Sequence, residues 1–225
     1  MTASRALLEM VLSDPQAGVA TFRTACQELL EESRQQEQLI DALLALARGQ
    51  RGVNHRETVD LAETVARVLE AQRPLAAERE LHVDAAVEDG PASAPVSGDQ
   101  RLIERLISNL LDNAIRHNID GGAIHVRVTN RAPATTLTVI NTGPRVPPEE
   151  IDRLLQPFQR LIPDRVEHER GLGLGLSIVA AIAHAHGAQL VIVAPANGGL
   201  EVDVHFASPN RAEAPPRLSA EPLLS

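Results

Sequence analysis

The sequence has no lysine, tryptophan or tyrosine, only one cysteine, and no long apolar run. All 21 basic residues are therefore arginines, and because they are scattered along the chain we attribute them to genome composition rather than to function. With Cys26 as the only cysteine, an intrachain disulfide and a cysteine-rich zinc site are excluded. Cys26 falls on the apolar stripe of a predicted helix, so we expect its side chain to pack in a core.

No stretch approaches the ~18 apolar residues that a membrane-spanning helix requires, and no signal peptide opens the sequence. We therefore expect a cytoplasmic chain without a membrane segment of its own, whose parent protein could still be anchored in the inner membrane. A net charge of −9 argues against nucleic-acid binding, which needs a basic surface. The 225 residues suffice for one substantial domain and a smaller appendage.

The first 50 residues are predicted to be mainly helical. A short apolar helix over residues 5–12 stops before Pro15, because proline cannot continue a helix. A longer helix follows over residues 18–48, and Gly49 and Gly52 break it. Positions of this helix that alternate in steps of four and three form a heptad seam, typical of a helical hairpin or coiled coil: Phe22, Cys26, Leu29, Ser33, Gln36, Ile40, Leu43 and Ala47.

The rest of the chain alternates between strand-like and helical patterns. Asp99 is placed to cap a strongly apolar helix that runs to about His117, and the region from residue 208 onward is rich in proline and predicted to be disordered. The element order predicts an α+β fold, a two-layer sandwich with helices on one face of a mixed sheet. We expect strands at 57–61, 81–87, 123–129, 136–141, 189–193 and 200–206, helices at 62–77, 99–117, 147–155 and 176–186, and a loop at 90–98.

One face of the helix 99–117 carries polar residues that can share a ligand. Asn109, Asn113 and Arg116 lie at i, i+4 and i+7, so two carboxamides and a guanidinium point the same way. The carboxamides offer neutral oxygens for a metal, and the nitrogen donors suit phosphate. Such residues more often only solvate a helix surface, so this face alone predicts little.

A glycine run over residues 171–175 precedes the helix 176–186 directly. Alternating glycines let the backbone approach an anion, and the following helix start offers free N–H groups. The run lacks the Gly-Lys-Ser/Thr ending of a Walker A loop, and it does not follow a strand as a Rossmann dinucleotide loop does. Alone it is a weak signal, because glycine-rich turns often only reverse the chain.

The order of four motifs is the decisive observation. The segments 109–114 (NLLDNA), 141–143 (NTG), 156–158 (QPF) and 171–175 (GLGLG) resemble, in order and spacing, the N, G1, F and G2 boxes of sensor histidine kinases. That family belongs to the superfamily of gyrase, Hsp90, histidine kinase and MutL ATPases, which share a Bergerat-type fold. The resemblance implies an ATP-binding catalytic domain over residues 53–207, a partial dimerisation hairpin over 1–50 and a disordered tail over 208–225.

The resemblance also implies roles for single residues at the phosphate end of the site. Asn109 would be the Mg²⁺ ligand and, with Arg116, a catalytic residue, while Asn113 and Arg116 would contact the phosphates of ATP. Residues 160–170 would form the lid over the nucleotide. The phosphates would be wrapped by Gly171, Leu172, Gly173, Leu174, Gly175 and Leu176.

At the base end, the resemblance implies that the imidazole of His117 stacks on the adenine. Asn141 stands where the family usually has an aspartate that accepts the adenine amino group. The asparagine oxygen can accept the same hydrogen bond, but without the strengthening charge. Gly143 would let the backbone lie close to the purine. Arg145 replaces the second glycine of the motif, so this loop departs from the family pattern.

The phosphoacceptor motif His-Glu-x-Arg-Thr-Pro of the family does not occur in the sequence. We expect either a truncated product of a longer sensor or a split or degenerate kinase, with the acceptor histidine domain in a parent or partner chain. Self-phosphorylation should then be absent or very weak. A response regulator and a homodimer formed through the helical hairpin are the implied partners. The alternatives are a serine kinase of the anti-sigma type on the same fold and a non-catalytic nucleotide-binding interaction module.

The remaining histidines show no metal-binding pattern. His184 and His186 are two apart on one helix and so point in different directions, which argues against a metal pair. We expect both to lie at the surface or to serve the C-terminal end of the helix, where the dipole favours a protonated imidazole.

Overall fold

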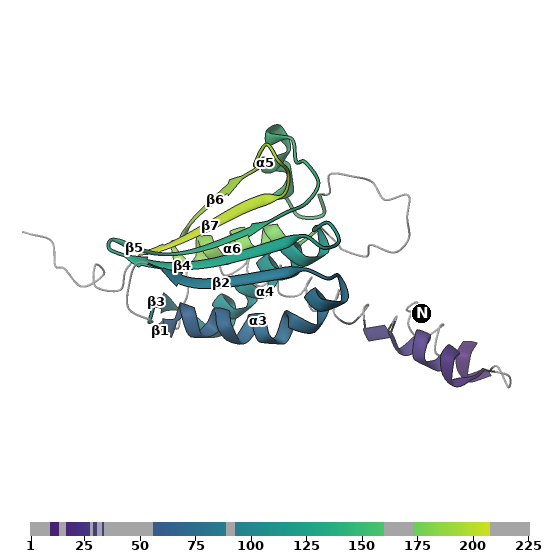
Figure 1. Ribbon diagram of the computed structural model, residues 1–225. Coiled ribbons are helices and arrows are strands. Elements are labelled where there is room, and N and C mark those ends of the chain that lie inside the picture. The colour runs from purple at the N-terminus through teal and green to yellow at the C-terminus, as the bar shows by residue number, and fades with distance from the viewer. Residues whose placement is uncertain are drawn as a thin grey trace, which may run out of the picture.

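A computed structural model describes residues 10–13, 17–27, 29–30, 33, 56–88, 93–159 and 173–207 of the chain. In the N-terminal part, residues 10–13 and 19–27 are helical, in agreement with the predicted helices (Figure 1). Most of the predicted hairpin, the lid at 160–170 and the tail at 208–225 lie outside the described residues. The expected core position of Cys26 is wrong, because its side chain is exposed while the neighbouring Ala25 is buried.

The main sheet has five strands in the order β2-β4-β5-β7-β6 (Figure 1). β2 and β4 run parallel, whereas the pairs β4–β5, β5–β7 and β7–β6 are antiparallel, which confirms the predicted mixed sheet. The strands span His82–Glu88 (β2), Ala123–Arg131 (β4), Ala134–Asn141 (β5), Gln189–Val193 (β6) and Leu200–Ala207 (β7). The helices α3 (Leu61–Glu78), α4 (Gln100–Arg116) and α6 (Gly175–His186) cover one face of this sheet.

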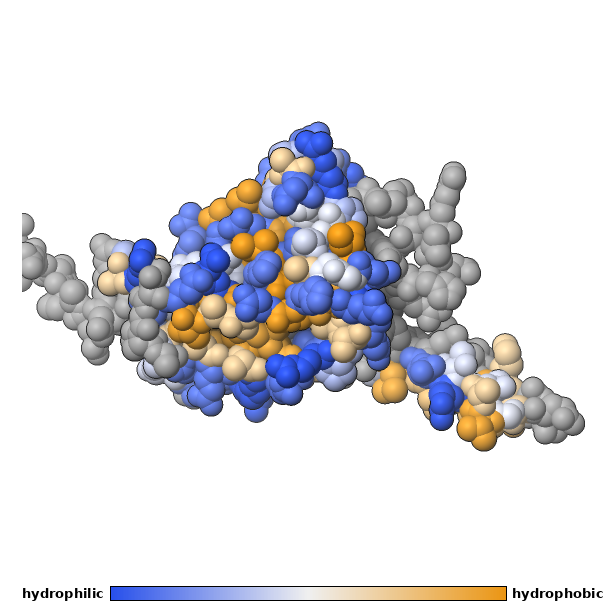
Figure 2. Space-filling model, in the orientation of Figure 1, coloured by the Kyte–Doolittle hydropathy of each residue, from blue (hydrophilic) through white to orange (hydrophobic). Residues whose placement is uncertain are grey.

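The core lies between the sheet and the three helices. Alternate residues of the central strands, such as Val126 and Leu137, point into it, and α4 contributes its whole apolar face, including Leu106 and Leu110. The sheet edge is less well covered. Figure 2 shows apolar side chains reaching the surface between α3 and β2. Val83 of this edge strand is 42% exposed.

Particular residues mark the ends of the helices, and Asp99 does so as predicted. Asp99 is the N-cap of α4, and its carboxylate accepts hydrogen bonds from the backbone of Arg101 (2.9 Å) and Leu102 (3.2 Å). Gly187 ends α6 in the left-handed conformation, with φ of 67°, which glycine adopts without steric cost. The predicted helix 147–155 is a 3-10 turn, η1 (Pro148–Glu150), followed by α5 (Ile151–Leu154).

The loop predicted at 90–98 is wrong in its second half. Residues Pro95–Gly98 form β3, which pairs antiparallel with β1 (Glu57–Asp60) in a separate two-stranded sheet. Proline is tolerated as the first residue of a strand, and Val96 is fully buried. The pairing joins segments more than 30 residues apart, so local sequence patterns do not reveal it.

His186 is buried rather than at the surface, whereas His184 is exposed. The ring Nδ1 lies 2.8 Å from the Ile182 carbonyl oxygen, and Nε2 lies 3.1 Å from the backbone nitrogen of Asp99. Because a carbonyl only accepts and a backbone N–H only donates, Nδ1 carries the proton and Nε2 accepts. Burial lowers the pKa of His186, so the residue serves the helix end as a neutral group. The expected protonated imidazole is therefore wrong at this position.

Candidate functional site

The polar face of α4 forms one wall of the candidate site. Asn109 is buried, and Asn113 and Arg116 are half-buried on the following turns. Asn109 Nδ2 donates a 2.8 Å hydrogen bond to the Arg105 carbonyl oxygen one turn earlier. Since a carbonyl can only accept, this bond fixes the amide orientation and leaves Oδ1 as the outward acceptor. The buried asparagine thus presents a neutral oxygen from a fixed position.

The start of α6 lies beside that oxygen. A Cβ added to Gly175 would be 3.9 Å from Asn109 Oδ1 and 4.0 Å from the Asn109 carbonyl oxygen. Neither a side-chain cap nor an acidic residue occupies the first turn of α6 among the described residues. Its N–H groups and the positive end of its dipole therefore suit an anion next to Asn109.

The glycine run is only partly described. Gly171 and Leu172 lie outside the described residues, whereas Gly173 has a φ of 66° and Leu174 and Leu176 are buried. The predicted phosphate contacts of Gly171 and Leu172 therefore stay predictions. The two buried leucines anchor the start of α6 in the core, so the backbone between them is the part that can face a ligand.

The turn around Phe158 is joined to the glycine run. The backbone N–H of Phe158 donates a 3.1 Å hydrogen bond to the Gly173 carbonyl oxygen. Phe158 has a φ of 64°, unusual for a residue with a side chain, and its ring is 60% exposed. Two motifs that are 15 residues apart in the sequence are thus in direct backbone contact.

A second group of predicted residues meets at the C-terminal end of α4. Asn141, at the end of β5, is buried, and its Nδ2 donates to the Thr142 carbonyl oxygen at 2.7 Å, which leaves Oδ1 as the acceptor. His117, the exposed C-cap residue of α4, lies beside Gly143. A Cβ on Gly143 would stand 2.6 Å from the His117 carbonyl oxygen, so only glycine fits there without a shift.

The structure adds two glycines to this end, which lie in the turn between β6 and β7. A Cβ on Gly199 would stand 1.8 Å from the Asn141 carbonyl oxygen, and one on Gly198 would stand 2.3 Å from that of Gly143. Both have positive φ, at 80° and 95°. The β6–β7 turn therefore packs its bare backbone on the loop after β5, and the double glycine was the available signal.

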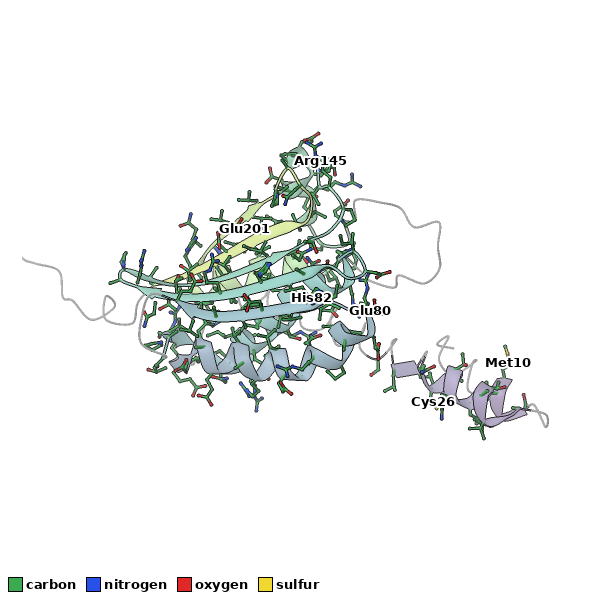
Figure 3. The ribbon with its side chains drawn as sticks, viewed as in Figure 1. Met10, Cys26, Glu80, His82, Arg145 and Glu201 are labelled. Carbon is green, nitrogen blue, oxygen red and sulfur yellow. The ribbon has the colours of Figure 1, made fainter. Side chains whose placement is uncertain are left out.

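Two arginines differ in their surroundings. Arg116 Nε lies 2.9 Å from the carboxylate of Asp112, one turn earlier on α4, and this pair is partly shielded from solvent. Arg145, which replaces the second glycine of its motif, is exposed and lies next to α5 (Figure 3). The structure thus orients Arg116 along the wall of the site, whereas Arg145 projects from the loop beyond Gly143.

Comparisons with known proteins agree on one family. Residues 98–210 match the family described as histidine kinase-, DNA gyrase B-, and HSP90-like ATPase. The sensor protein CutS of Streptomyces coelicolor is 37% identical over 202 residues, which cover 89% of this chain and 48% of CutS. The chain therefore spans about half the length of this relative.

Solved structures share the fold. The mycobacterial sensor histidine kinase MprB is 28% identical, with a TM-score of 0.58 over 68% of this chain and 97% of that structure. The histidine kinase ThkA, crystallised in complex with the response regulator protein TrrA, has a TM-score of 0.64 over 91% of this chain and 58% of that structure. At 17% identity, ThkA supports the fold alone.

Proposed function

Because this chain belongs to the histidine kinase-, DNA gyrase B- and HSP90-like ATPases and carries the ATP-binding catalytic domain of a sensor histidine kinase, we propose a specific reaction for it. The chain transfers the γ-phosphoryl group of ATP to a histidine on another domain or chain, for relay to a response regulator. The serine-kinase and interaction-module hypotheses are not favoured, since the similar proteins are sensor histidine kinases.

The observation that carries this proposal is the alignment of two half-sites along α4. The oxygen of Asn109 faces the start of α6 at one end, and the loop of Gly143 lies on His117 at the other. Eight residues of helix separate Asn109 from His117, a rise of about 12 Å. One wall therefore offers an anion-binding end and a base-binding end in a single line, as an elongated nucleotide requires.

At the phosphate end, Asn113, Arg116 and the backbone at Gly173–Leu176 bind the phosphate oxygens. Among the described residues, no three His, Cys, Asp or Glu side chains gather to hold a metal ion, so a divalent cation needs a different donor. Asn109 Oδ1 fits Mg²⁺, which prefers oxygen ligands and is commonly shared between protein and phosphates. When bound, Mg²⁺ neutralises phosphate charge, and Asn109 with Arg116 positions the transferred group.

At the base end, Asn141 Oδ1 accepts a hydrogen bond from the 6-amino group of adenine. The Thr142 carbonyl oxygen keeps the amide in the accepting orientation, because rotating the amide would bring two oxygens together. Gly143 allows the backbone to approach the purine. The exposed imidazole of His117 stacks on the adenine. These residues select adenine and fix its position relative to the phosphates.

The acceptor histidine is supplied from elsewhere, because the sequence lacks the family motif that carries it. The helical segment before residue 50 contributes to a homodimer, and residues 53–207 form the catalytic domain. For a longer parent protein, we propose an anchor in the inner membrane. Within the part of the chain that the structure describes, no helix is long and apolar enough to span a membrane.

Transfer of radiolabel from ATP tests the proposal. The chain is incubated with Mg²⁺, γ-labelled ATP and a separate acceptor hairpin from a sensor histidine kinase. We expect acid-labile label on the hairpin and little on the chain itself. Acid-stable label on serine would support the anti-sigma type of kinase, and absence of Mg-ATP binding at millimolar concentration would leave only the interaction module.

The Asn109→Ala variant tests the metal ligand directly. We expect it to remove the Mg²⁺-dependent part of ATP affinity in calorimetric titration, while the far-ultraviolet circular dichroism stays unchanged because alanine suits a helix interior. Asn130→Ala is a matched control, since Asn130 lies at the far end of β4 and bonds the Ser93 carbonyl oxygen. Equal Mg²⁺ dependence in both variants would contradict the assignment.

A further inference from the structure

We propose that Arg79 is a positioning residue that holds the base end of the nucleotide site. Arg79 is the C-cap residue of α3, in the turn that leads to β2, and it belongs to none of the four motifs. The proposal rests on the proposed function, since it assigns Arg79 a role in binding the same nucleotide. It concerns a residue that touches no ligand and acts through the C-terminal turn of α4.

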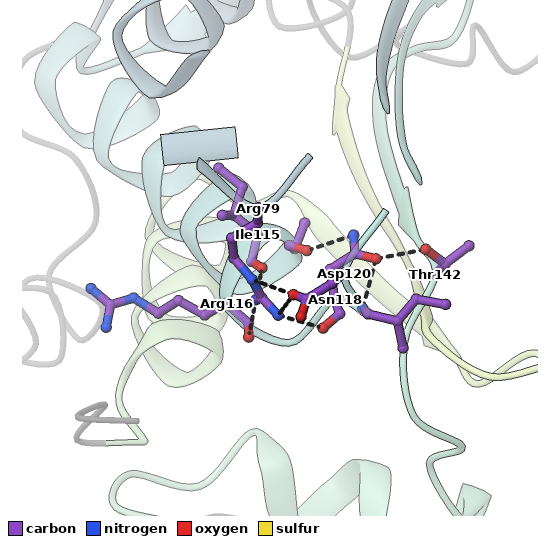
Figure 4. Close-up of polar contacts among 8 residues, drawn as sticks. Arg79, Ile115, Arg116, Asn118, Asp120 and Thr142 are labelled. Carbon is purple, nitrogen blue, oxygen red and sulfur yellow. Dashed lines mark hydrogen bonds and ion pairs between the residues drawn. The ribbon is translucent and has the colours of Figure 1, made fainter. Parts of the chain in front are cut away.

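Arg79 makes five polar contacts with that turn (Figure 4). Nη1 donates to the carbonyl oxygens of Ile115 (2.5 Å) and Arg116 (2.7 Å), and Nη2 donates to that of Asn118 (3.0 Å). Nη2 and Nε also donate to Asp120 Oδ1, at 3.0 and 3.3 Å. One side chain therefore binds three backbone carbonyls, those of Ile115, Arg116 and Asn118, and a carboxylate of the same short segment.

A guanidinium suits this position for two physical reasons. The last carbonyl groups of a helix have no partner within the helix, and they form the negative end of its dipole, where a cation is favourable. The planar guanidinium presents several N–H donors in a fixed fork, whereas a lysine ammonium is a point charge. The Arg79 side chain is 27% exposed, so solvent screens these contacts only in part.

The turn that Arg79 holds carries the base end of the site. The His117 carbonyl oxygen lies between the carbonyls that Arg79 binds, and Gly143 packs directly on it. Asn118 links the same turn to the end of β5, because its Oδ1 accepts a 2.6 Å hydrogen bond from Thr142 Oγ1. Thr142 stands between Asn141 and Gly143 in the chain, so movement of the turn displaces both of these residues at the base end of the site.

Gly122 shows how closely this link is packed. A Cβ there would stand 2.2 Å from Asn118 Oδ1 and 2.4 Å from Thr142 Oγ1. The Asn118 amide is also fixed from its other end, since Nδ2 donates to the carbonyl oxygens of Ala114 (3.1 Å) and Ala123 (3.2 Å). The hydrogen-bonded chain from Arg79 to Thr142 is thus closely packed, so we expect a shift of the turn to displace Thr142 as well.

The Arg79→Ala variant tests this role by calorimetric titration with Mg-ADP, Mg-ATP and tripolyphosphate. We expect the dissociation constants of both nucleotides to rise by the same factor, about tenfold, as for the loss of one well-placed hydrogen bond. The affinity for tripolyphosphate, which has no base, should fall by a clearly smaller factor, because Asn109 and Gly175 lie about two turns away and only Arg116 of the phosphate-binding residues lies in the turn that Arg79 holds. Arg79→Lys should restore part of the nucleotide affinity.

Arg73→Ala is the matched control, because Arg73 is a 77% exposed arginine of α3 that pairs only with Glu70 among the described residues. A merely structural cap would lower the melting temperature of Arg79→Ala but leave nucleotide affinity per folded molecule at the wild-type value, which would overturn the proposal. If Arg79→Ala does not fold, the titrations are made with Arg79→Lys alone. Wild-type nucleotide affinity of Arg79→Lys would then overturn the proposal. Failure of the wild-type chain to bind Mg-ATP would instead overturn the proposed function.

Discussion

The two ends of α4 are held in place by opposite kinds of chemistry. At the N-terminal end, the carboxylate of Asp99 caps the first turn and the neutral ring of His186 accepts from the Asp99 backbone. At the C-terminal end, the cationic Arg79 binds the last carbonyls. Each end thus receives the sign of charge that the helix dipole favours, and the N-terminal end also depends on a buried histidine whose pKa is lowered by desolvation.

The two ends of α4 should also differ in whether they affect the stability of the fold or the binding of nucleotide. His186 lies in the core, with its ring 6.3 Å from that of Phe206 and in edge contact with it, far along α4 from the residues of the proposed site. Arg79 lies near the surface and next to the base end. We therefore expect changes at the N-terminal end to act mainly on the free energy of unfolding, and changes at the C-terminal end to act mainly on nucleotide affinity.

The largest expected effect belongs to His186→Ala. Removing the buried ring leaves a cavity against Phe206 and an unsatisfied Asp99 N–H, so the free energy of unfolding should fall by about 3 kcal/mol. Urea denaturation measures it, and His184→Ala on the exposed side of the same helix should change it by less than about 0.5 kcal/mol. Equal effects in the two variants would remove the distinction drawn here between the core and surface histidines.

The pH dependence of stability gives a smaller effect of the same origin. Burial lowers the pKa of His186, so the unfolded chain takes up the proton first as the pH falls below 6.5. Arg56 also disfavours the proton, whereas the bond to the Ile182 carbonyl and the charge of Asp99 favour it. The free energy of unfolding should therefore be constant above about pH 7 and fall below 6.5, by at most about 1.4 kcal/mol per pH unit.

Urea titrations at several pH values between 7.5 and 5 measure this loss. The window lies above the range in which Asp60 titrates, because hydrogen bonds from Ser93 and from the backbone outweigh its desolvation and hold the pKa of that carboxyl below 3.8. In His186→Ala the slope should be largely absent. A slope that is the same in the wild type and this variant would assign the acid sensitivity to other groups.

The sequence predicted those parts of the fold whose signals are local. Asp99 and the apolar face of α4 identified the helix and its start. The strand β3 was missed because it is four residues long and owes its conformation to a distant partner, β1. Cys26 was misplaced for a related reason, since a heptad seam indicates an apolar contact without indicating the surface that makes it.

The sequence likewise predicted one part of the candidate site and not another. The motif order predicted that Asn109 and Gly175 would meet, and that Asn141 and Gly143 would lie near His117, and the structure brings each set together. Arg79 could not be found from the sequence, because it lies in a turn without a motif and its partners are backbone carbonyls of another element. Any residue can supply a backbone carbonyl, so the residue types at positions 115, 116 and 118 do not indicate this contact. Only the folded structure reveals it.

The smallest expected effect belongs to Asp99→Ala, which separates the contribution of the Asp99 carboxylate from that of the His186 ring at the N-terminal end of α4. Asp99→Ala removes the capping carboxylate but keeps the backbone N–H that His186 binds, so the free energy of unfolding should fall by about 1 kcal/mol. Nucleotide affinity should stay at the wild-type value, because the start of α4 lies away from both ends of the site. Urea denaturation and calorimetric titration of one sample measure both quantities. A loss of affinity as large as that of Arg79→Ala would show that the two ends of α4 are coupled through the helix, and the separation of stability from binding would fail.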